Sequence, residues 1–138
     1  MDRARGACKA ARVANTHFER IGGEPKLRAI IDDFVDRIFD DIMIGFFFRN
    51  VDRRRLKELE FQHAAEHLGG PVRYGGRPLK QAHAAHRIMG GQFARRKEVL
   101  RQTLVAHGVA PEIIDAWLAH TESLRLQVTS DPDGQCTD

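Results

Sequence analysis

The chain has 138 residues, of which 42% are hydrophobic and 30% are charged. This length and apolar content predict one domain with a single hydrophobic core. The net charge of +3 comes from basic and acidic residues that alternate along most segments, which argues against nucleic acid as a partner.

No run of uncharged apolar residues approaches the 18 or so that a membrane helix needs. The first nine residues lack the apolar stretch of a secretory signal peptide, so we expect a cytoplasmic protein with no membrane partner. Cys8 and Cys136 lie in polar terminal segments and form neither a CxxC pair nor a CxxCH haem-attachment motif. Free cytosolic thiols are the simpler interpretation, and a disulfide between the two segments is the alternative.

The first predicted elements are a flexible arm and two helices. Residues 1–15 show no sustained period and predict a flexible N-terminal arm. Thr16 and Glu19 have the spacing of a capping box, and the glycine pair that follows ends a helix of about two turns. Pro25 then begins a second helix, which ends near Asp40. Its apolar residues recur at intervals of three and four: Leu27, Ile30, Ile31, Phe34, Val35, Ile38 and Phe39.

Three adjacent phenylalanines, Phe46, Phe47 and Phe48, occupy a short irregular segment after this helix. Three adjacent rings cannot all face one core. At least one is therefore expected to be exposed or to contact a second apolar body, such as a bound ring system. The alternative is that all three fill the core.

A third helix is predicted from Asp52 to Leu68, with two adjoining stripes. One stripe is apolar: Phe61, Ala64, Ala65 and Leu68. The other is mixed, and it fits either the border of a buried face or a polar site: Leu56, Leu59, Glu60, His63 and His67. A zinc site at the two histidines is weakly supported because the HExxH order is missing, and His17, His107 and His120 are scattered without partners at zinc spacing.

The glycine-rich crossing at residues 68–78 leads to the first candidate for an axial ligand. Four glycines and two prolines predict a non-helical path, and Pro78 can start a helical turn. The alanines around His83 leave space for a flat ligand over its imidazole.

Two further helices complete the predicted domain, which covers residues 16–130. One opens at Gly90 and ends at His107, and the other runs from Pro111 to the turn at residues 130–134. Residues 131–138 form a polar C-terminal tail. No segment alternates with period two between turns, so the predicted fold class is all-α.

Two basic runs, Arg53–Arg55 and Arg95–Lys97, are most simply solvated helix faces. In a small pocket protein, some of these arginines could also neutralise a ligand carboxylate.

Several motifs occur in a specific order. A glycine pair follows a very short first helix, Phe47-Phe48 follows the second, Leu68-Gly69-Gly70-Pro71 precedes Tyr74 and Gly76, and Leu79-Lys80-Gln81-Ala82-His83 comes next. Over residues 17–128 this set resembles the bacterial truncated haemoglobins, most closely those of group I. The resemblance implies a truncated two-over-two helical globin sandwich that binds haem b, iron protoporphyrin IX.

The resemblance also implies roles for particular residues. His83 would be the proximal iron ligand, with its second ring nitrogen oriented by a backbone carbonyl near Leu79 or Lys80. Phe48 would pack on the porphyrin face. Further cofactor-binding positions are Phe34, Leu56, Tyr74, Ile88 and Phe93. Lys80, His86 and Arg87 lie around His83 in the sequence and could supply cations for the haem carboxylates.

The distal pocket departs from the group I pattern. Val35 stands where members usually have a tyrosine that bonds to bound oxygen, and Glu60 stands where glutamine is common. Valine has no donor, and an ionised glutamate is only an acceptor. Either a protonated Glu60 donates, or Glu60 turns to solvent and leaves His63 as the distal polar group.

We therefore expect a haem protein that reversibly binds a diatomic gas, namely oxygen, nitric oxide or carbon monoxide. Its role would be oxygen binding or transport, or nitric oxide detoxification by dioxygenation with an electron-donor reductase as partner. One alternative is a haem-dependent, peroxidase-like redox enzyme that uses Glu60 or His63 as acid and base. Another is a helical interaction module that has lost haem.

Overall fold

The computed structural model describes residues 16–83 and 88–129. Within these ranges the chain forms helices joined by turns and loops, and it contains no strand. The elements are α2 (His17–Ile21), α3 (Gly23–Phe39), the 3-10 helix η1 (Gly45–Phe48), α4 (Arg53–His67), α5 (Leu79–His83), α6 (Gly90–Ala106), α7 (Pro111–Ser123) and α8 (Arg125–Val128). The all-α prediction is confirmed. The predicted terminal arm and tail, with Cys8 and Cys136, lie outside the described residues.

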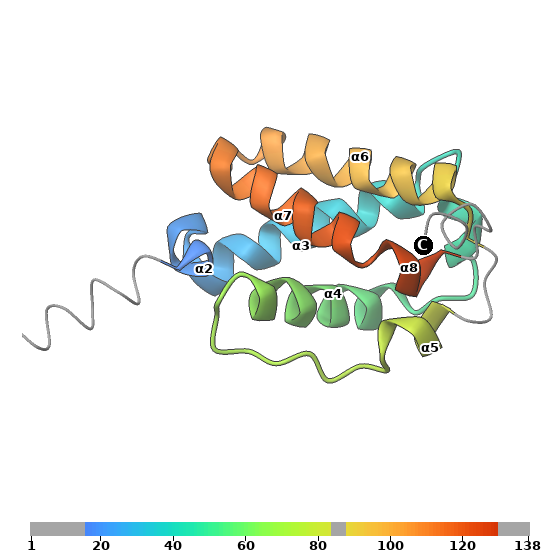
Figure 1. Cartoon of the computed structure of the whole chain (residues 1–138), viewed down its shortest axis with the longest axis horizontal. Helices are drawn as coiled ribbons and strands as arrows, with labels where there is room; N and C mark the ends of the chain where they lie inside the picture. Colours follow the sequence, from blue (N-terminus) through green and yellow to red (C-terminus); the bar gives the residue numbers. More distant parts are fainter. Residues whose placement is uncertain (1–15, 84–87, 130–138) are drawn as a thin grey trace, which may run out of the picture.

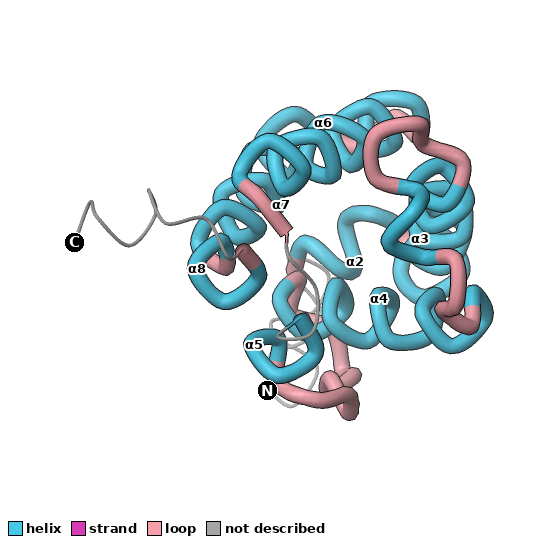
Figure 2. Tube along the Cα trace, turned by 90° about the vertical axis from the view of Figure 1, so that its right-hand side faces the viewer, coloured by secondary structure: helices cyan, strands magenta, loops and turns pink. Residues whose placement is uncertain are grey.

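The four long helices form two pairs. Helix α3 packs against α4, and α6 packs against α7, while α3 also contacts α6 across the pairs (Figure 1). The end-on view in Figure 2 shows the two pairs facing each other, with the short helices α5 and α8 beside them. Helix α5 packs on α8, although more than 40 residues separate them in the sequence. This is the two-over-two arrangement that the sequence resemblance implies.

Helix α2 begins and ends where its sequence predicts. The Thr16 Oγ1 accepts a hydrogen bond from the Glu19 backbone N–H at 3.1 Å, so Thr16 is the N-cap. Gly22 ends the helix with a φ of 121°, and a Cβ there would lie 2.9 Å from the Lys26 Cβ. Glycine is therefore required at this position. The helix has five residues and is shorter than the predicted two turns.

The core lies mainly between α3, α4, α6 and α7. Helix α3 supplies its predicted stripe, and the apolar stripe of α4 packs against it. Each large side chain buried here contributes about 1.5–3 kcal/mol of hydrophobic stabilisation. The buried residues include Leu27, Ile30, Ile31, Phe34, Val35, Ile38, Phe61, Ala64, Ala65, Leu100, Leu104, Ile113 and Trp117.

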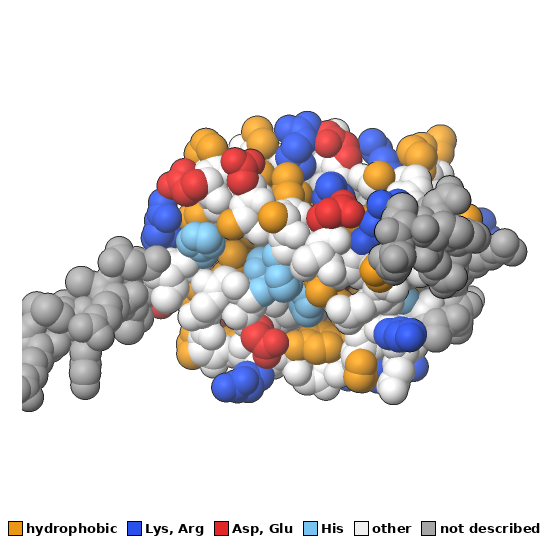
Figure 3. Space-filling view, in the orientation of Figure 1, with side chains coloured by type: hydrophobic (Ala, Val, Ile, Leu, Met, Phe, Trp, Pro, Cys, Tyr) orange, Lys and Arg blue, Asp and Glu red, His pale blue; other side chains and the backbone are white. Residues whose placement is uncertain are grey.

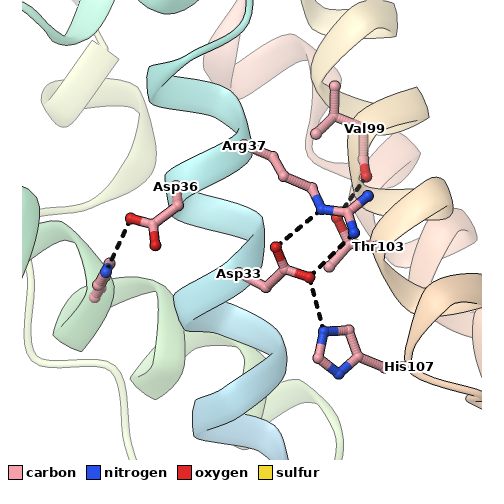
Figure 4. A network of polar contacts seen from close by, with 7 residues as sticks. Asp33, Asp36, Arg37, Val99, Thr103 and His107 are labelled. Carbon is pink, nitrogen blue, oxygen red and sulfur yellow. Dashed lines mark hydrogen bonds and ion pairs between the residues drawn. The ribbon is translucent and has the colours of Figure 1, made fainter.

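A polar network ties α3 to the end of α6 (Figure 4). Arg37 donates two hydrogen bonds to the Asp33 carboxylate, at 3.0 and 3.2 Å, and the His107 Nε2 lies 2.9 Å from the Asp33 Oδ2. The hydrogen bond from Arg37 is the largest cause of a lowered pKa at Asp33. Nearby, the buried Thr103 hydroxyl donates to the Val99 carbonyl at 2.8 Å. These contacts satisfy polar groups at the edge of the core.

The three phenylalanines of the corner after α3 face different ways. Phe46 is 48% exposed, whereas Phe47 and Phe48 are half-buried. Phe48 stacks on Phe39, with 5.1 Å between the ring centroids. Gly45 lets the chain turn closely here, because a Cβ at this position would lie 2.6 Å from the Phe39 carbonyl oxygen. The prediction that the three rings cannot share one face is confirmed.

The fifth predicted helix is divided into α7 and α8. The chain turns at Leu124, whose N–H donates to the Thr121 carbonyl at 3.1 Å, three residues earlier. This tighter turn redirects α8 toward α5. None of the described helices is long and apolar enough to cross a membrane.

Candidate functional site

A cavity of ≈ 310 Å³ lies among α3, α4, α5, α6, α7 and α8. Its walls are mainly apolar and aromatic, with a few polar groups that converge on it, as is usual for cofactor sites. The apolar lining includes Ile31, Phe34, Ile38, Ile44, Phe47, Phe48, Leu56, Leu59, Ile88, Phe93, Leu100 and Trp117. The polar lining includes Glu60, His63, His67, Tyr74, Arg77, His83, Arg96 and His120.

His83 enters this cavity from the last position of α5. Its Nδ1 lies 2.7 Å from the Leu79 carbonyl oxygen, which is one of the two carbonyls predicted to orient it. Because a carbonyl only accepts, Nδ1 carries the proton, and in the neutral form of such a ring the lone pair is on Nε2. Histidines that ligate metals are commonly oriented by a backbone carbonyl in this way.

Most residues predicted for the site line the cavity. They are Phe34, Phe48, Leu56, Tyr74, His83, Ile88 and Phe93, together with Glu60 and His63. Val35 is fully buried and is not part of the lining, since it packs within the core. Lys80 is exposed and also lies outside the lining. His86 and Arg87 lie outside the described residues.

The glycine-rich crossing brings Tyr74 to the cavity wall. The Tyr74 hydroxyl donates to the Arg77 carbonyl at 2.7 Å, and the Tyr74 N–H donates to Glu66 on α4 at 2.9 Å. A Cβ at Gly76 would lie 2.5 Å from the Tyr74 hydroxyl, so only glycine fits beneath this ring. Burial raises the pKa of Tyr74. The hydrogen bond to Glu66 thus attaches the crossing to α4 just before the chain enters α5.

Glu60 makes an ion pair inside the cavity. Its Oε2 accepts a hydrogen bond from the Arg96 Nη2 at 2.8 Å, and the two side chains are only 25% and 27% exposed. The Arg96 guanidinium also lies over the Phe34 ring, with its Cζ 5.0 Å from the ring centroid. Glu60 therefore neither turns to solvent nor stands alone in an apolar pocket.

Arg96 is the site residue that the sequence interpretation missed. It belongs to the basic run Arg95–Lys97, for which a solvated helix face was the simpler interpretation and a role in a pocket was the alternative, and Arg96 does line the cavity. Position 96 is three residues after Phe93 and four before Leu100, and both are buried. This spacing places Arg96 on the inner face of α6 and was the signal that could have found it.

Three histidines gather at the α7 side of the cavity. His67 of α4 stacks on His120 of α7 with 4.1 Å between ring centroids, and His63 lies 5.7 Å from His120. Figure 3 shows histidines at the middle of one face, between α7 and α4. Sequence spacing could not reveal this cluster because two distant helices form it.

Burial keeps these imidazoles neutral. It lowers the pKa of His63 and His120, and burial with the neighbouring His120 lowers that of His67 to about 3. The buried His120 Nε2 has no hydrogen-bond partner among the described residues. Among these residues, no three histidine, cysteine or acidic side chains are placed to hold a metal ion together.

The residues present fit a flat, apolar metal cofactor held through one histidine. Among the imidazoles of the lining, that of His83 has its Nδ1 proton directed to a carbonyl, and rings from η1, α3 and α6 line the same cavity. Haem is ligated in this way through one imidazole nitrogen within an apolar pocket.

The comparisons with known proteins agree with this geometry. The model of the bacterial-like globin family matches residues 16–130. A group 1 truncated haemoglobin from Mycolicibacterium paratuberculosis is 30% identical over 120 residues, covering 87% of this chain and 88% of that protein. The chain belongs to the group 1 truncated haemoglobins, within the bacterial-like globin family.

Solved structures support the same assignment. The Fe(III) form of the truncated haemoglobin from Tetrahymena pyriformis superposes with a TM-score of 0.77 at 27% identity, covering 83% of this chain and 98% of that one. A 2/2 haemoglobin from Synechococcus, 23% identical, shares the fold with a TM-score of 0.72, covering 80% of this chain and 93% of that one. The predicted two-over-two globin sandwich is confirmed. For this truncated haemoglobin, the family implies haem and a diatomic ligand.

The histidine cluster makes a testable prediction about pH. The pKa of His67 is about 3 in the folded chain and about 6.5 in the unfolded chain, so between these values the unfolded state binds more protons. The stability that the neutral His67 contributes is present above pH 6.5 and is lost as the pH falls toward 3. Urea unfolding at pH 7, 6, 5 and 4.5 should show a shallower pH dependence in both His67→Leu and His67→Gln.

The two replacements differ in polarity but both remove the titrating group. They should therefore change the absolute stability differently and the pH slope alike. A parental slope in both variants would show that another group is responsible.

Proposed function

We propose that this truncated haemoglobin binds haem b in the cavity with His83 as the axial ligand, and that it reversibly binds a diatomic gas. The observation that carries this proposal is the contact between the His83 Nδ1 and the Leu79 carbonyl at the wall of the aromatic cavity. When bound, haem iron supplies the coordination position for oxygen, nitric oxide or carbon monoxide.

The chain's own residues would hold the cofactor in distinct ways. His83 ligates through Nε2, and Phe48 covers one apolar ring face, with Phe34, Leu56, Tyr74, Ile88 and Phe93 completing the walls. Lys80, His86 and Arg87, which are near His83 in the sequence, would supply cations for the haem carboxylates. Arg77 lines the cavity as well, which supports a basic rim on this side.

The physiological role we propose is oxygen binding or transport, or nitric oxide detoxification, in the cytoplasm. The detoxification reaction, dioxygenation of nitric oxide, needs an electron-donor reductase to return the iron to its ferrous form. Val35 supplies no hydroxyl donor, so a hydrogen bond that slows the release of the gas would have to come from another residue of the cavity.

The first test is the absorption spectrum of the protein purified with haem supplied. A Soret band that shifts when carbon monoxide is added to the reduced protein supports the proposal. Its absence would favour the helical interaction module.

Replacing His83 with alanine should remove the axial ligand, so haem should be lost or bound loosely. The measurement is haem transfer to an acceptor protein, together with the ferrous and carbonyl spectra. His63→Ala is the matched control, since it removes another cavity-lining imidazole and should retain haem. If His83→Ala kept the parental spectra and His63→Ala lost haem, the two roles would be reversed.

Replacing Phe48 with alanine should destabilise the haem-bound protein by about 3 kcal/mol or more, because it removes a ring that covers the cofactor. The haem-free chain should lose less, through the stacking on Phe39 alone. Denaturant titrations of both forms measure the difference. Phe46→Ala is the control, because this exposed neighbour should cost little in either form. Equal losses at Phe48 in both forms would mark it as an ordinary core residue.

A second candidate function, a peroxidase-like redox activity, is favoured by one observation. His63 lines the cavity with a pKa that burial lowers, so its imidazole is neutral at pH 7 and can accept a proton from peroxide. Saturable peroxide turnover that falls strongly in His63→Leu would support this activity. Turnover equal to that of free haem would exclude it.

A further inference from the structure

The cavity of this truncated haemoglobin has charged groups of both signs among its apolar walls. Its lining holds two guanidinium groups, Arg77 and Arg96, and one carboxylate, Glu60. The cavity-lining histidines whose pKa values are lowered by burial, His63, His67 and His120, add no positive charge at neutral pH. Among the described residues of the lining, arginine side chains therefore outnumber carboxylates by one.

Arg96 is held in place by two contacts. Glu60 on α4 accepts its Nη2–H at 2.8 Å, and the Phe34 ring on α3 lies beneath the guanidinium at 5.0 Å. These contacts come from two different helices and counteract the tendency of a long cationic side chain to reach into bulk water. Arg96 is thus oriented by the fold before any ligand enters.

The guanidinium has more donors than this pairing uses. Arginine carries five N–H donors in a rigid fork, and within the described residues Arg96 makes one hydrogen bond, to Glu60. The remaining N–H groups belong to a side chain that lines the cavity. A hydrogen bond from a guanidinium to an anion is about twice as strong as a neutral one.

We propose that Arg96 is the residue through which this cavity selects small monovalent anions whose outer atom accepts a hydrogen bond, such as nitrite or azide. Arg96 donates to the anion, and Glu60 is a positioning residue that holds the guanidinium in the cavity. This inference rests on the proposed function, because the anion is a ligand of the ferric haem protein.

Glu60 has a second effect on anion binding, so the proposal predicts opposite changes in anion affinity for variants of Glu60 and Arg96. Its negative charge lies 2.8 Å from Arg96 and so repels any anion that approaches the same guanidinium. Removing the charge while keeping an acceptor oxygen, as in Glu60→Gln, should strengthen anion binding. Removing the guanidinium should weaken it.

The experiment measures the dissociation constants of azide, nitrite and imidazole by absorbance titration of the ferric haem protein. Arg96→Leu should raise the constants for azide and nitrite by about tenfold to a hundredfold and leave that of neutral imidazole nearly unchanged. Arg96→Lys should give an intermediate value, since an ammonium keeps the charge without the fork. Glu60→Gln should lower the constants for both anions by about threefold or more.

Arg101→Leu is the matched control on the same helix. It removes the same charge from an exposed position that pairs with Glu98, so anion affinities should stay within about twofold of the parent. Thermal stability is a second readout. Saturating azide should raise the melting temperature of Glu60→Gln more than that of the parent. In this variant Arg96 has lost its carboxylate partner, and the azide anion compensates the positive charge of its guanidinium.

Three outcomes would overturn the inference. The first is an anion affinity in Arg96→Leu equal to that of the parent. The second is unchanged or weaker anion binding in Glu60→Gln. This second result overturns the inference even if Arg96→Leu does not retain haem. The third is faster haem transfer to an acceptor protein from both Arg96 variants, with parental anion affinities in the fraction that still holds haem, which would assign Arg96 to a haem carboxylate. A parent protein without a haem spectrum would overturn the proposed function as well, whereas a normal spectrum with these results overturns the inference alone.

Discussion

Helix α4 carries two faces, and both the core and the cavity depend on them. One face places Phe61, Ala64 and Ala65 against α3, where they are almost fully buried. The adjoining face places leucines, Glu60 and two histidines along the cavity. Because one helix supplies both faces, the packing of the core fixes the rotation of α4 and hence the position of each polar group in the cavity. A small rotation of α4 would replace cavity residues with core residues.

The non-helical crossing at residues 68–78 connects α4 to the helix α5 that carries His83. The chain must leave α4, pass along the outside and return with a histidine that faces the mixed stripe. Contacts from Glu66 and Gln62 to the backbone of residues 74 and 75 fasten the crossing to α4, and glycine at position 76 allows the Tyr74 ring to lie close. The crossing is therefore a specific structure although it has no regular secondary structure. The one-turn helix α5 then fixes the His83 ring through a carbonyl of its own turn.

The sequence was informative where local rules apply. Helix starts at Thr16, Asp52 and Pro111 follow from capping and proline chemistry, and the stripe of α3 follows from its period. Most of the predicted cofactor positions line the cavity, but this came from resemblance to a family and not from spacing. The glycine-rich crossing and the alanines around His83 made it a candidate ligand, and only the resemblance gave it the role of an iron ligand. The division of the last helix at Leu124 escaped prediction, because its apolar period continues across the turn.

The polar groups that meet from different helices could not be derived from local patterns. His120 lies more than 50 residues from His67, yet their rings stack at 4.1 Å because α4 and α7 both contribute to the wall of the cavity. The pairing of Glu60 with Arg96 has the same origin. Each residue alone fits a solvated helix face, and only the packing of α3 against both α4 and α6 brings the carboxylate and the guanidinium together.

The energetics of the ion pair between Glu60 and Arg96 indicate why a charged pair occupies an apolar cavity. A partly desolvated pair offers little stability by itself, since the cost of removing two charges from water offsets most of their attraction. Apolar side chains of similar volume would fill the same space between Phe34 and α4 at no such cost. The pair is therefore a poor device for holding the helices together and a good one for presenting a fixed positive charge in an apolar cavity. A neutral gas gains little from such a charge, while an anion or a ligand that becomes polarised on iron gains much more. The chemistry of Arg96 and Glu60 thus points to the charge on the ligand, more than its size, as the property by which this cavity selects.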